Sequence, residues 1–203
     1  LRLGVVPLAS FDPMRLISLF AERHPGLRFQ LHALSSDQIL EGLVRNQLDL
    51  GLSYLDRLDR EHFASLELAE ARMGLLYDQR HFHFVSSSLR WEQLANLPLG
   101  LLSTGMHFRL SIDHSFRARG LCPQVRLEAD AVHHLTQAVS AGLCCSVMPL
   151  PADGAPTDGH LRLLPIEDAH TLAPQGLIMR RSAPASPLAQ ACFEEAREWL
   201  ANA

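Results

Sequence analysis

The chain alternates strand-like and helix-like segments, and this alternation limits the fold more than any other feature of the sequence. The strand-like segments are short and apolar, whereas the helix-like ones repeat apolar residues every three or four positions. Ser35 and Gln38 form a predicted capping box, and Asn46 can adopt the left-handed conformation that ends a helix. The first unit runs strand, helix, strand, helix, strand over residues 1–6, 14–24, 27–31, 35–46 and 47–52.

The same order of segments returns in the second half of the chain. The second unit covers residues 99–102, 106–119, 125–128, 131–141 and 143–148. Two β-α-β-α-β units predict an α/β fold with parallel sheets, right-handed crossovers and helices on both faces. Further strands are predicted over 66–77, 161–166 and 172–179, and a last helix over 187–200, which Ser186 caps and Pro187 begins.

The positions of these extra segments predict two Rossmann-like lobes. If the last helix packs on the first unit, the chain crosses between lobes near Tyr77 and again within residues 168–176. Two crossing segments predict a hinge with a cleft between the lobes. We expect lobe I to comprise residues 1–76 and 175–203, and lobe II residues 77–174.

The charged residues exclude several classes of protein. All 18 basic residues are Arg, and 22 acidic residues give a net charge of −4. Without Lys the chain cannot build a Walker-type phosphate loop, a pyridoxal-phosphate enzyme or a protein kinase. Because DNA binding draws on excess positive charge, this chain by itself is not expected to bind DNA tightly.

Four cysteines, at positions 122, 144, 145 and 192, show neither the spacing of a zinc site nor that of a disulfide framework. They are interpreted as reduced, small apolar residues of a cytoplasmic protein. No signal peptide opens the chain and no apolar run is long enough to span a membrane, so no membrane partner is expected. Because the chain starts at Leu1 within a strand-like segment, we take it to be a piece of a longer polypeptide.

Candidate ligand contacts follow from the predicted sheets. In open α/β sheets, ligands bind beyond the carboxyl ends of the strands, and this rule selects the loops that follow each strand. The predicted ligand-binding residues are Pro7, Leu8, Ala9, Ser10, Phe11, Ser36, Ser103, Thr104, Gly105 and His107.

The same loops lie at predicted helix starts. Ser10 or Asp12 is expected to cap the first helix, and Ser103 or Thr104 with Gly105 to open the helix of the second unit. Two helix N-termini, one from each lobe, favour a small anion such as a carboxylate, and the apolar first loop favours a ligand with a hydrocarbon part. Alternatively, these hydroxyl residues serve only as helix caps.

Metal binding and catalysis have less support in the sequence. Eleven His residues include His81-x-His83 and His133-His134, but none belongs to a recognised ligand pattern, so no metal and no cofactor is predicted. Glu194-Glu195 is interpreted as part of a solvated helix face. No set of acid, base and nucleophile is evident, and an enzyme is not predicted.

Several motifs, in this order and spacing, carry a resemblance to a known family. They are Leu1-Arg2-Leu3-Gly4, Phe20-x-x-x-His24-Pro25-x-Leu27, Leu43-x-x-Asn46-x-Leu48-Asp49-Leu50-Gly51-Leu52, Trp91-x-x-Leu94-x-x-Leu97-Pro98 and Ala138-Val139-x-Ala141-Gly142-Leu143-x-x-x-Val147-Met148-Pro149. Over essentially its whole length the chain resembles the effector-binding domain of LysR-type transcriptional regulators. Two positions depart from the pattern: Asn46 replaces a usual Gly, and Cys144 replaces the second Gly of a Gly-x-Gly, which is expected to crowd the backbone near the cleft.

The resemblance implies a type 2 periplasmic-binding-protein-like fold that senses a small effector in its interlobe cleft. It also implies a winged helix-turn-helix domain before residue 1, through which alone DNA would be bound. It further implies a homodimer, tetrameric in the full-length protein, with the helix over 14–24 of one chain against the helix over 106–119 of the other. Only Cys122 lies in the region where peroxide-sensing members pair two cysteines, so redox sensing is not carried over.

Two other interpretations share the fold. An exported solute-binding protein would have similar lobes and a similar cleft, and an enzyme could be built on the same scaffold. A helix-turn-helix encoded upstream would distinguish among the three. The effector's identity, the target genes and the direction of regulation depend on residues that the pattern does not specify.

Overall fold

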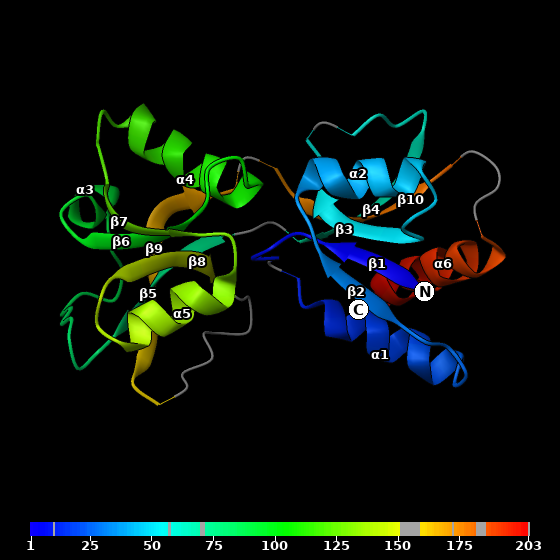
Figure 1. Ribbon diagram of the computed structural model, residues 1–203, viewed down its shortest axis with the longest axis horizontal. Coiled ribbons are helices and arrows are strands. Elements are labelled where there is room, and N and C mark those ends of the chain that lie inside the picture. Colours follow the sequence, from blue (N-terminus) through cyan, green and yellow to red (C-terminus); the bar gives the residue numbers. More distant parts are fainter. Residues whose placement is uncertain are drawn as a thin grey trace. The chain divides into compact units, whose positions relative to one another are not determined.

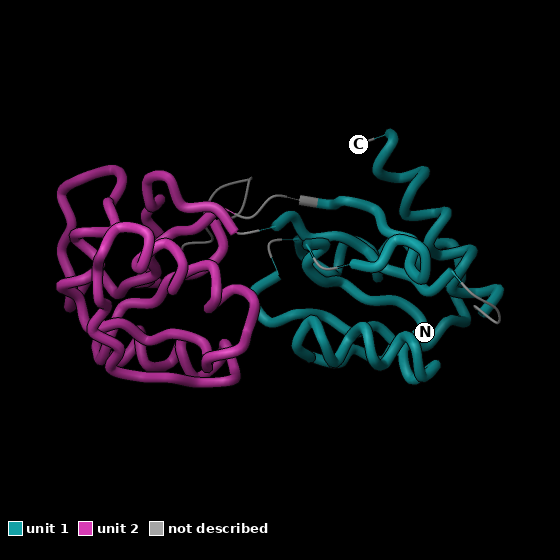
Figure 2. The backbone as a smooth tube through the Cα atoms, turned by 90° about the horizontal axis from the view of Figure 1, so that it is seen from above, with its two compact units in different colours: residues 1–70, 173–203 teal, residues 71–172 magenta. Residues whose placement is uncertain are grey.

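The computed structural model describes residues 1–9, 11–56, 58–69, 72–150, 159–171, 173–181 and 186–202. The chain forms two compact units, one of residues 1–70 and 173–203 and the other of residues 71–172 (Figure 2). From the sequence we predicted the boundaries between the two lobes at residues 76/77 and 174/175, which are a few residues later along the chain than the boundaries in the structure. The difference arises because the strand over Arg72–Asp78 pairs with strands of the second unit.

Unit 1 is built on a five-stranded sheet with the order β2-β1-β3-β10-β4 (Figure 1). Its strands are β1 (Arg2–Val5), β2 (Gln30–Ala33), β3 (Leu50–Tyr54), β4 (Phe63–Ala69) and β10 (Gln175–Arg180). Its helices are α1 (Pro13–Arg23), α2 (Ser36–Val44) and α6 (Pro187–Ala201). Strands β1, β2 and β3 are parallel, as the β-α-β-α-β pattern predicts, whereas β10 runs antiparallel to both of its neighbours.

Helices cover both faces of the first sheet. One apolar cluster joins the sheet to α1 and α6, and a second joins it to α2. Helix α2 and the segment that follows it lie very close to β1. A Cβ atom at Gly4 would lie 3.0 Å from Cγ1 of Ile39 in α2 and 2.7 Å from Cδ1 of Leu48 after it. The absence of a side chain at Gly4 therefore gives α2 the room to pack on the sheet.

The predicted ends of the unit 1 helices are confirmed in three places. Ser35 and Gln38 form the capping box of α2, Asn46 has a φ of 56°, and Ser186 accepts a hydrogen bond from the backbone of Ala189 at the start of α6. Helix α6 packs on α1 and β10 within unit 1. Trp199 is half-buried, because it lies near the end of α6 at the margin of the cluster.

Unit 2 repeats this arrangement with a sheet of order β7-β6-β8-β5-β9. Its strands are β5 (Arg72–Asp78), β6 (Pro98–Leu102), β7 (Gln124–Ala129), β8 (Cys145–Leu150) and β9 (Leu161–His170). Its helices are α3 (Trp91–Leu94), α4 (His107–Ala118) and α5 (Val132–Ser140). Figure 1 shows α3 and α4 on one face of this sheet and α5 on the other.

Two expectations about the strands are corrected. The sheets are mixed, because β10 in unit 1 and β5 in unit 2 run antiparallel to their neighbours. The segment 66–77, expected to be one strand, contains the end of β4 and most of β5, which belong to different sheets. Alternation of apolar residues gives neither strand direction nor pairing partner.

Cys144, which stands where the family usually has Gly, packs closely against the backbone of β6. A Cβ atom at Gly100 would lie 2.7 Å from Sγ of Cys144, so the thiol fills the space that this glycine leaves on β6. Cys144 clusters there with Ala138 and Val139 of α5. Burial raises the pKa of the Cys144 thiol, consistent with a packing role.

Candidate functional site

The loop after β1 contains five of the predicted site residues, of which Ser10 lies outside the described residues. Pro7, Leu8 and Ala9 are half-buried. Leu8 has a φ of 58°, a left-handed conformation that is uncommon for a residue other than glycine. Backbone strain of this kind is found more often at ligand sites than elsewhere, so it makes the loop a candidate.

Phe11 faces the interior of unit 1. It is 6% exposed, and its ring meets that of Trp199 edge to face, with the centroids 6.2 Å apart. The guanidinium of Arg15 lies over both rings, 5.8 Å from the centroid of Phe11 and 5.2 Å from that of Trp199. Phe11 therefore anchors the loop to the core.

Asp12 is the N-cap of α1. Its carboxylate accepts a hydrogen bond from the backbone N–H of Met14 at 2.9 Å. A negative charge at this end of the helix is stabilised by the helix dipole. An anionic ligand at the start of α1 would have to compete with this carboxylate. The expectation that two free helix N-termini bind one anion therefore has less support at α1.

Two serine hydroxyls lie at strand and loop ends of unit 1 without a hydrogen-bond partner among the described residues. Oγ of Ser36, in the first turn of α2, is buried, as is Oγ of Ser53 near the end of β3. Buried hydroxyls usually have partners, so these two oxygens are the strongest candidates in unit 1 for contact with a polar ligand. Ser36 is among the predicted site residues, whereas Ser53 is not.

Tyr54 follows Ser53 at the end of β3, and its side chain hydrogen-bonds with that of Gln175, the first residue of β10. Burial raises the pKa of the Tyr54 phenol, which keeps it neutral. Gln175 is fully buried. Sequence reasoning did not select it, because strand pairing across more than a hundred residues places it beside Tyr54.

The loop between β6 and α4 carries the other predicted site residues. Ser103 and His107 are half-buried, and Thr104 and Gly105 are exposed. The backbone N–H of Ser103 donates to the carbonyl of Ala129 at 2.9 Å, which continues the pairing of β6 with β7.

The start of α4 differs from the sequence expectation. The helix begins at His107, and its N-cap residue Met106 makes no side-chain capping hydrogen bond. Ser103 and Thr104 therefore do not cap it, because Gly105 has a φ of 96° and separates them from the helical residues. At α1 the carboxylate of the N-cap residue offsets the partial positive charge of the helix N-terminus. At α4 the N-cap side chain does not offset this charge.

Arg109 supports this loop from the buried side of α4. It is 6% exposed, and its guanidinium donates to Oδ1 of Asp113 at 2.8 Å and to Oε1 of Glu128 at 2.8 Å. It also donates to the carbonyl oxygen of Leu102 at 2.7 Å. The four-residue spacing of Arg109 and Asp113 is typical of an ion pair on one helix face. Nothing in the sequence indicated that Arg109 also contacts Leu102 and Glu128.

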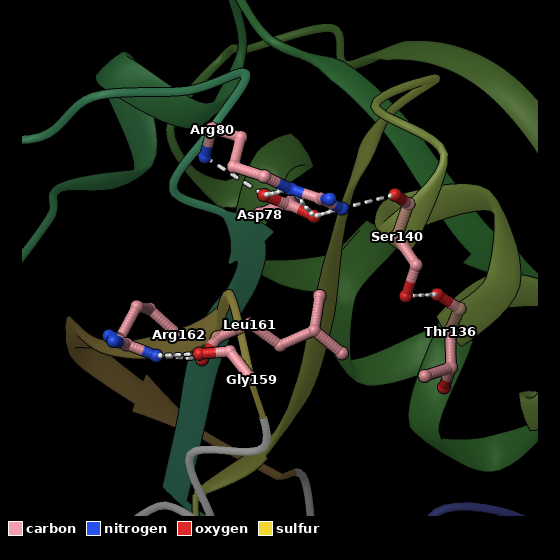
Figure 3. Close-up of polar contacts among 7 residues, drawn as sticks. All are labelled: Asp78, Arg80, Thr136, Ser140, Gly159, Leu161 and Arg162. Atoms are coloured by element: carbon pink, nitrogen blue, oxygen red, sulfur yellow. Dashed lines mark hydrogen bonds and ion pairs between the residues drawn. The ribbon is translucent and has the colours of Figure 1, made fainter.

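A second polar network fixes the end of β5 in unit 2 (Figure 3). Asp78 accepts hydrogen bonds from the backbone N–H and the guanidinium of Arg80, and that guanidinium also donates to the carbonyl of Ser140 at 3.1 Å. The hydroxyl of Ser140 in turn donates to the carbonyl of Thr136 at 3.0 Å. Hydrogen bonding from Arg80 lowers the pKa of Asp78 to about 2.

Described residues of unit 1 line at least two cavities, and none of the lining residues given for these two is a predicted site residue. One, of about 250 Å³, lies between the ends of α2 and β10 and includes Arg2, Asp49 and Arg180. The other, of about 350 Å³, is lined by residues of β2, α2 and the segment after it, among them His32 and Gln38.

Metal-ligating side chains converge at one place among the described residues, and the sequence did not predict it. His24, Cys192 and Glu195 each offer a ligand atom, and these atoms lie within 4.8 Å of one another. The interpretation of Glu194-Glu195 as part of a solvated helix face is therefore wrong for Glu195. Its side chain is 17% exposed, and its Oε1 lies 2.9 Å from Nε2 of His24.

None of the described helices is both long and apolar enough to cross a membrane.

Comparison with known proteins gives consistent matches. Residues 1–201 match the model of a family described as the LysR substrate binding domain. The HTH-type transcriptional regulator CbbR of Rhodospirillum rubrum is 26% identical over 192 residues, which are 94% of this chain and 63% of that protein. The chain spans about half to under two thirds of the length of the curated relatives it matches.

Solved structures share the fold. The effector binding domain of QuiR in complex with shikimate has a TM-score of 0.79 at 17% identity, covering 98% of this chain and 95% of that one. The regulatory domain of CcmR from Synechocystis PCC6803, in complex with 2-PG, has a TM-score of 0.76 at 21% identity, covering 96% and 93% of the two chains.

Proposed function

Because the chain belongs to the LysR substrate binding domain family, we propose that it senses a small-molecule effector for a bacterial transcriptional regulator. The match over residues 1–201 is the observation that carries this proposal. Curated relatives are transcriptional regulators, so an exported solute-binding protein is not favoured, and an enzymatic role has no support from them. Two neighbours of the same fold were solved in complex with shikimate and with 2-PG.

The proposed effector contacts come from loops of both units, as the family resemblance implies. In unit 1 they are Pro7, Leu8, Ala9, Ser10, Phe11 and Ser36, and in unit 2 Ser103, Thr104, Gly105 and His107. Two observations support the first set: the hydroxyl of Ser36 has no hydrogen-bond partner among the described residues, and the backbone at Leu8 is strained. Phe11 is proposed to act through the position of its loop, because its ring is buried in the core.

We propose that the effector is a small organic molecule with an anionic or strongly polar group at the start of α4. That helix has no side-chain cap, whereas α1 already has the carboxylate of Asp12. The apolar residues of the first loop suit a hydrocarbon part. Ser53 is added to the proposed contacts because its buried hydroxyl has no partner among the described residues.

Transmission of the signal requires two states that bind the effector with different affinity. We propose that a change in lobe angle or in dimer packing provides them. The proposed homodimer places α1 of one copy against α4 of the other. Exposed apolar side chains support this pairing: Met14 on α1 and Leu31 on the edge strand β2, Leu110 on α4 and Val125 on the edge strand β7.

DNA binding is assigned to a winged helix-turn-helix domain outside this chain. The net charge of −4 supports this division, because a DNA-binding surface needs excess positive charge. Assembly of the full-length protein as a tetramer and its location in the cytoplasm are likewise proposals, which rest on the family.

Calorimetric titration of the chain with a panel of small carboxylic acids and sugar acids tests the proposal. Ser36→Ala, Ser103→Ala and Thr104→Ala are each expected to weaken binding of a hit by about 1 kcal/mol, or about fivefold. Ser87→Ala, at an exposed serine of the segment between β5 and α3, is the control and should bind as the unchanged chain does. A hit that binds equally to all three variants would refute the site assignment.

A further inference from the structure

The end of α1 and the middle of α6 bring together three side chains of different chemistry. His24 is the C-cap of α1, where its backbone N–H donates to the carbonyl of Phe20 at 2.9 Å. Cys192 and Glu195 lie three residues apart on α6 and therefore share one helix face. Helices α1 and α6 are in contact, so that His24 and Glu195 meet across 171 residues of sequence.

Burial makes this cluster different from an ordinary surface ion pair. Cys192 is fully buried, the side chain of Glu195 is 17% exposed and that of His24 is 33% exposed. Oε1 of Glu195 lies 2.9 Å from Nε2 of His24, whereas Oε2 is buried without a hydrogen-bond partner among the described residues. A buried carboxylate oxygen without a hydrogen bond carries a desolvation cost.

The geometry is close to that of a metal centre. One ligand atom from each residue lies within 4.8 Å of the others. In tetrahedral zinc sites the metal lies roughly 2.0–2.3 Å from N, O and S ligands, which places the ligand atoms roughly 3.3–3.8 Å from one another. Side-chain movements of roughly 1 Å would therefore bring the three ligand atoms to these spacings around an ion. The exposed part of His24 leaves a route for entry.

We propose that His24, Cys192 and Glu195 bind a divalent transition metal, with zinc the best match. An imidazole, a thiolate and a carboxylate suit a metal of borderline softness, whereas Ca²⁺ and Mg²⁺ prefer oxygen ligands. Three protein ligands leave a fourth position for water or for an exogenous group. The unpartnered oxygen of Glu195 gains a role in this arrangement.

Such a metal links two segments that are distant in sequence. Helix α1 belongs to the first β-α-β-α-β unit, and α6 is the last helix of the chain. The ion would bind to the folded arrangement of α1 and α6 and so stabilise unit 1 by mass action. The inference does not depend on the proposed effector site, because all three ligands lie within unit 1 and none belongs to the effector loops.

Titration of the chain with Co²⁺, after removal of metals with a chelator, tests the proposal. Cobalt replaces zinc and reports its ligands: a thiolate ligand gives a charge-transfer absorption band, and four-coordination gives intense visible bands. One equivalent per chain and displacement by Zn²⁺ are expected. His24→Gln and Glu195→Gln are expected to weaken Co²⁺ binding at least roughly tenfold, and Cys192→Ser to abolish the charge-transfer band.

Two control variants separate this site from other histidines and cysteines. Cys122→Ser removes an exposed thiol, and His62→Gln removes an exposed histidine that hydrogen-bonds with Asp59. Both should leave Co²⁺ binding unchanged. Because Cys192 is buried, thermal melting without metal is used to check that the Cys192→Ser variant folds. If this variant does not fold, His24→Gln and Glu195→Gln decide the outcome.

Thermal melting distinguishes a metal site from a hydrogen bond that only joins the two helices. Zn²⁺ should raise the melting temperature of the unchanged chain and of the Cys122→Ser and His62→Gln variants, but not that of His24→Gln or Glu195→Gln. A purely structural His24–Glu195 contact would lower stability in these variants without any response to Zn²⁺ in the unchanged chain. That result, or a charge-transfer band that survives Cys192→Ser, would overturn the proposal.

Discussion

The guanidinium of Arg109 donates a hydrogen bond to the carbonyl oxygen of Leu102 at 2.7 Å, and so ties α4 to the last residue of β6. The loop with Ser103, Thr104 and Gly105 begins at the next residue. A buried cation, with Asp113 and Glu128 as its counter-ions, therefore holds the strand end from which the proposed effector loop departs.

Replacing this cation should destabilise unit 2. Arg109→Met is expected to cost about 2–3 kcal/mol of unfolding free energy, because it removes hydrogen bonds of a charged group and leaves the Leu102 carbonyl without this donor. Urea unfolding measures the change. Arg117→Met, at an exposed position on the same helix, is the control and should cost less than about 1 kcal/mol. Equal effects of the two substitutions would contradict a special role for Arg109.

The Asp78–Arg80 network should make stability depend on pH in an acidic window. The pKa of Asp78 is about 2 in the folded chain and about 3.9 in an unfolded one, so the folded state favours the ionised form. This contribution is fully present above about pH 4 and disappears as the pH falls towards about 2. Asp78→Asn should therefore be less stable than the unchanged chain at neutral pH, and the difference should shrink between about pH 4 and 2.

Urea unfolding at a series of pH values measures this window. Asp130→Asn, which removes an exposed carboxylate of the same unit, is the matched control for the change in net charge. A difference between the Asp78→Asn variant and the unchanged chain that stays constant from neutral pH to about 2 would contradict the linkage argument.

The two tryptophans are expected to differ in their contribution to stability. Trp91 is 1% exposed and packs edge to face on Phe116 with centroids 5.0 Å apart, so Trp91→Ala should cost about 3–5 kcal/mol. Trp199 is half-buried, and Trp199→Ala should cost about 1–2 kcal/mol through lost contacts with Phe11 and Arg15. Denaturant unfolding of both variants measures this order, and a reversed order would refute it.

The proposed dimer predicts that charge on either partner face weakens association. Met14 and Leu110 are each 45% exposed, and replacing either with Glu should raise the dissociation constant at least roughly tenfold. Sedimentation equilibrium measures the change. Val85→Glu, at a fully exposed residue outside α1 and α4, should leave association unchanged. A chain that is monomeric at high micromolar concentration before any substitution would argue against the dimer itself.

Local signals in the sequence predicted most elements of the fold. Ser35 with Gln38, and Ser186, mark helix starts through contacts with residues close by in the chain, and Asn46 marks a helix end through its own left-handed backbone conformation. The start of α4 was predicted to within one residue, but its capping by Ser103 or Thr104 was wrong because the positive φ of Gly105 is a property of the folded loop. The antiparallel direction of β10 and β5 was missed because apolar alternation is the same in both directions.

The candidate sites were harder to predict because they depend on contacts between distant residues. Ser36 was selected from its place after a strand, and the loops from a general rule for α/β sheets. Glu195 looked solvated beside Glu194, yet the packing of α6 on α1 buries it against His24. The spacing of three residues from Cys192 puts Glu195 on the packed face of α6, but only the packing of α6 on α1 shows that His24 lies opposite it.

The strand order of unit 1 also bears on how the chain folds as it leaves the ribosome. Strand β4 is joined to the rest of its sheet only through β10, which is synthesised about a hundred residues later. Unit 2 is one continuous stretch and contains all the strands of its own sheet. We therefore expect the second unit to finish folding first during synthesis, while β3 and β4 keep open edges that attract chaperones until β10 emerges between them.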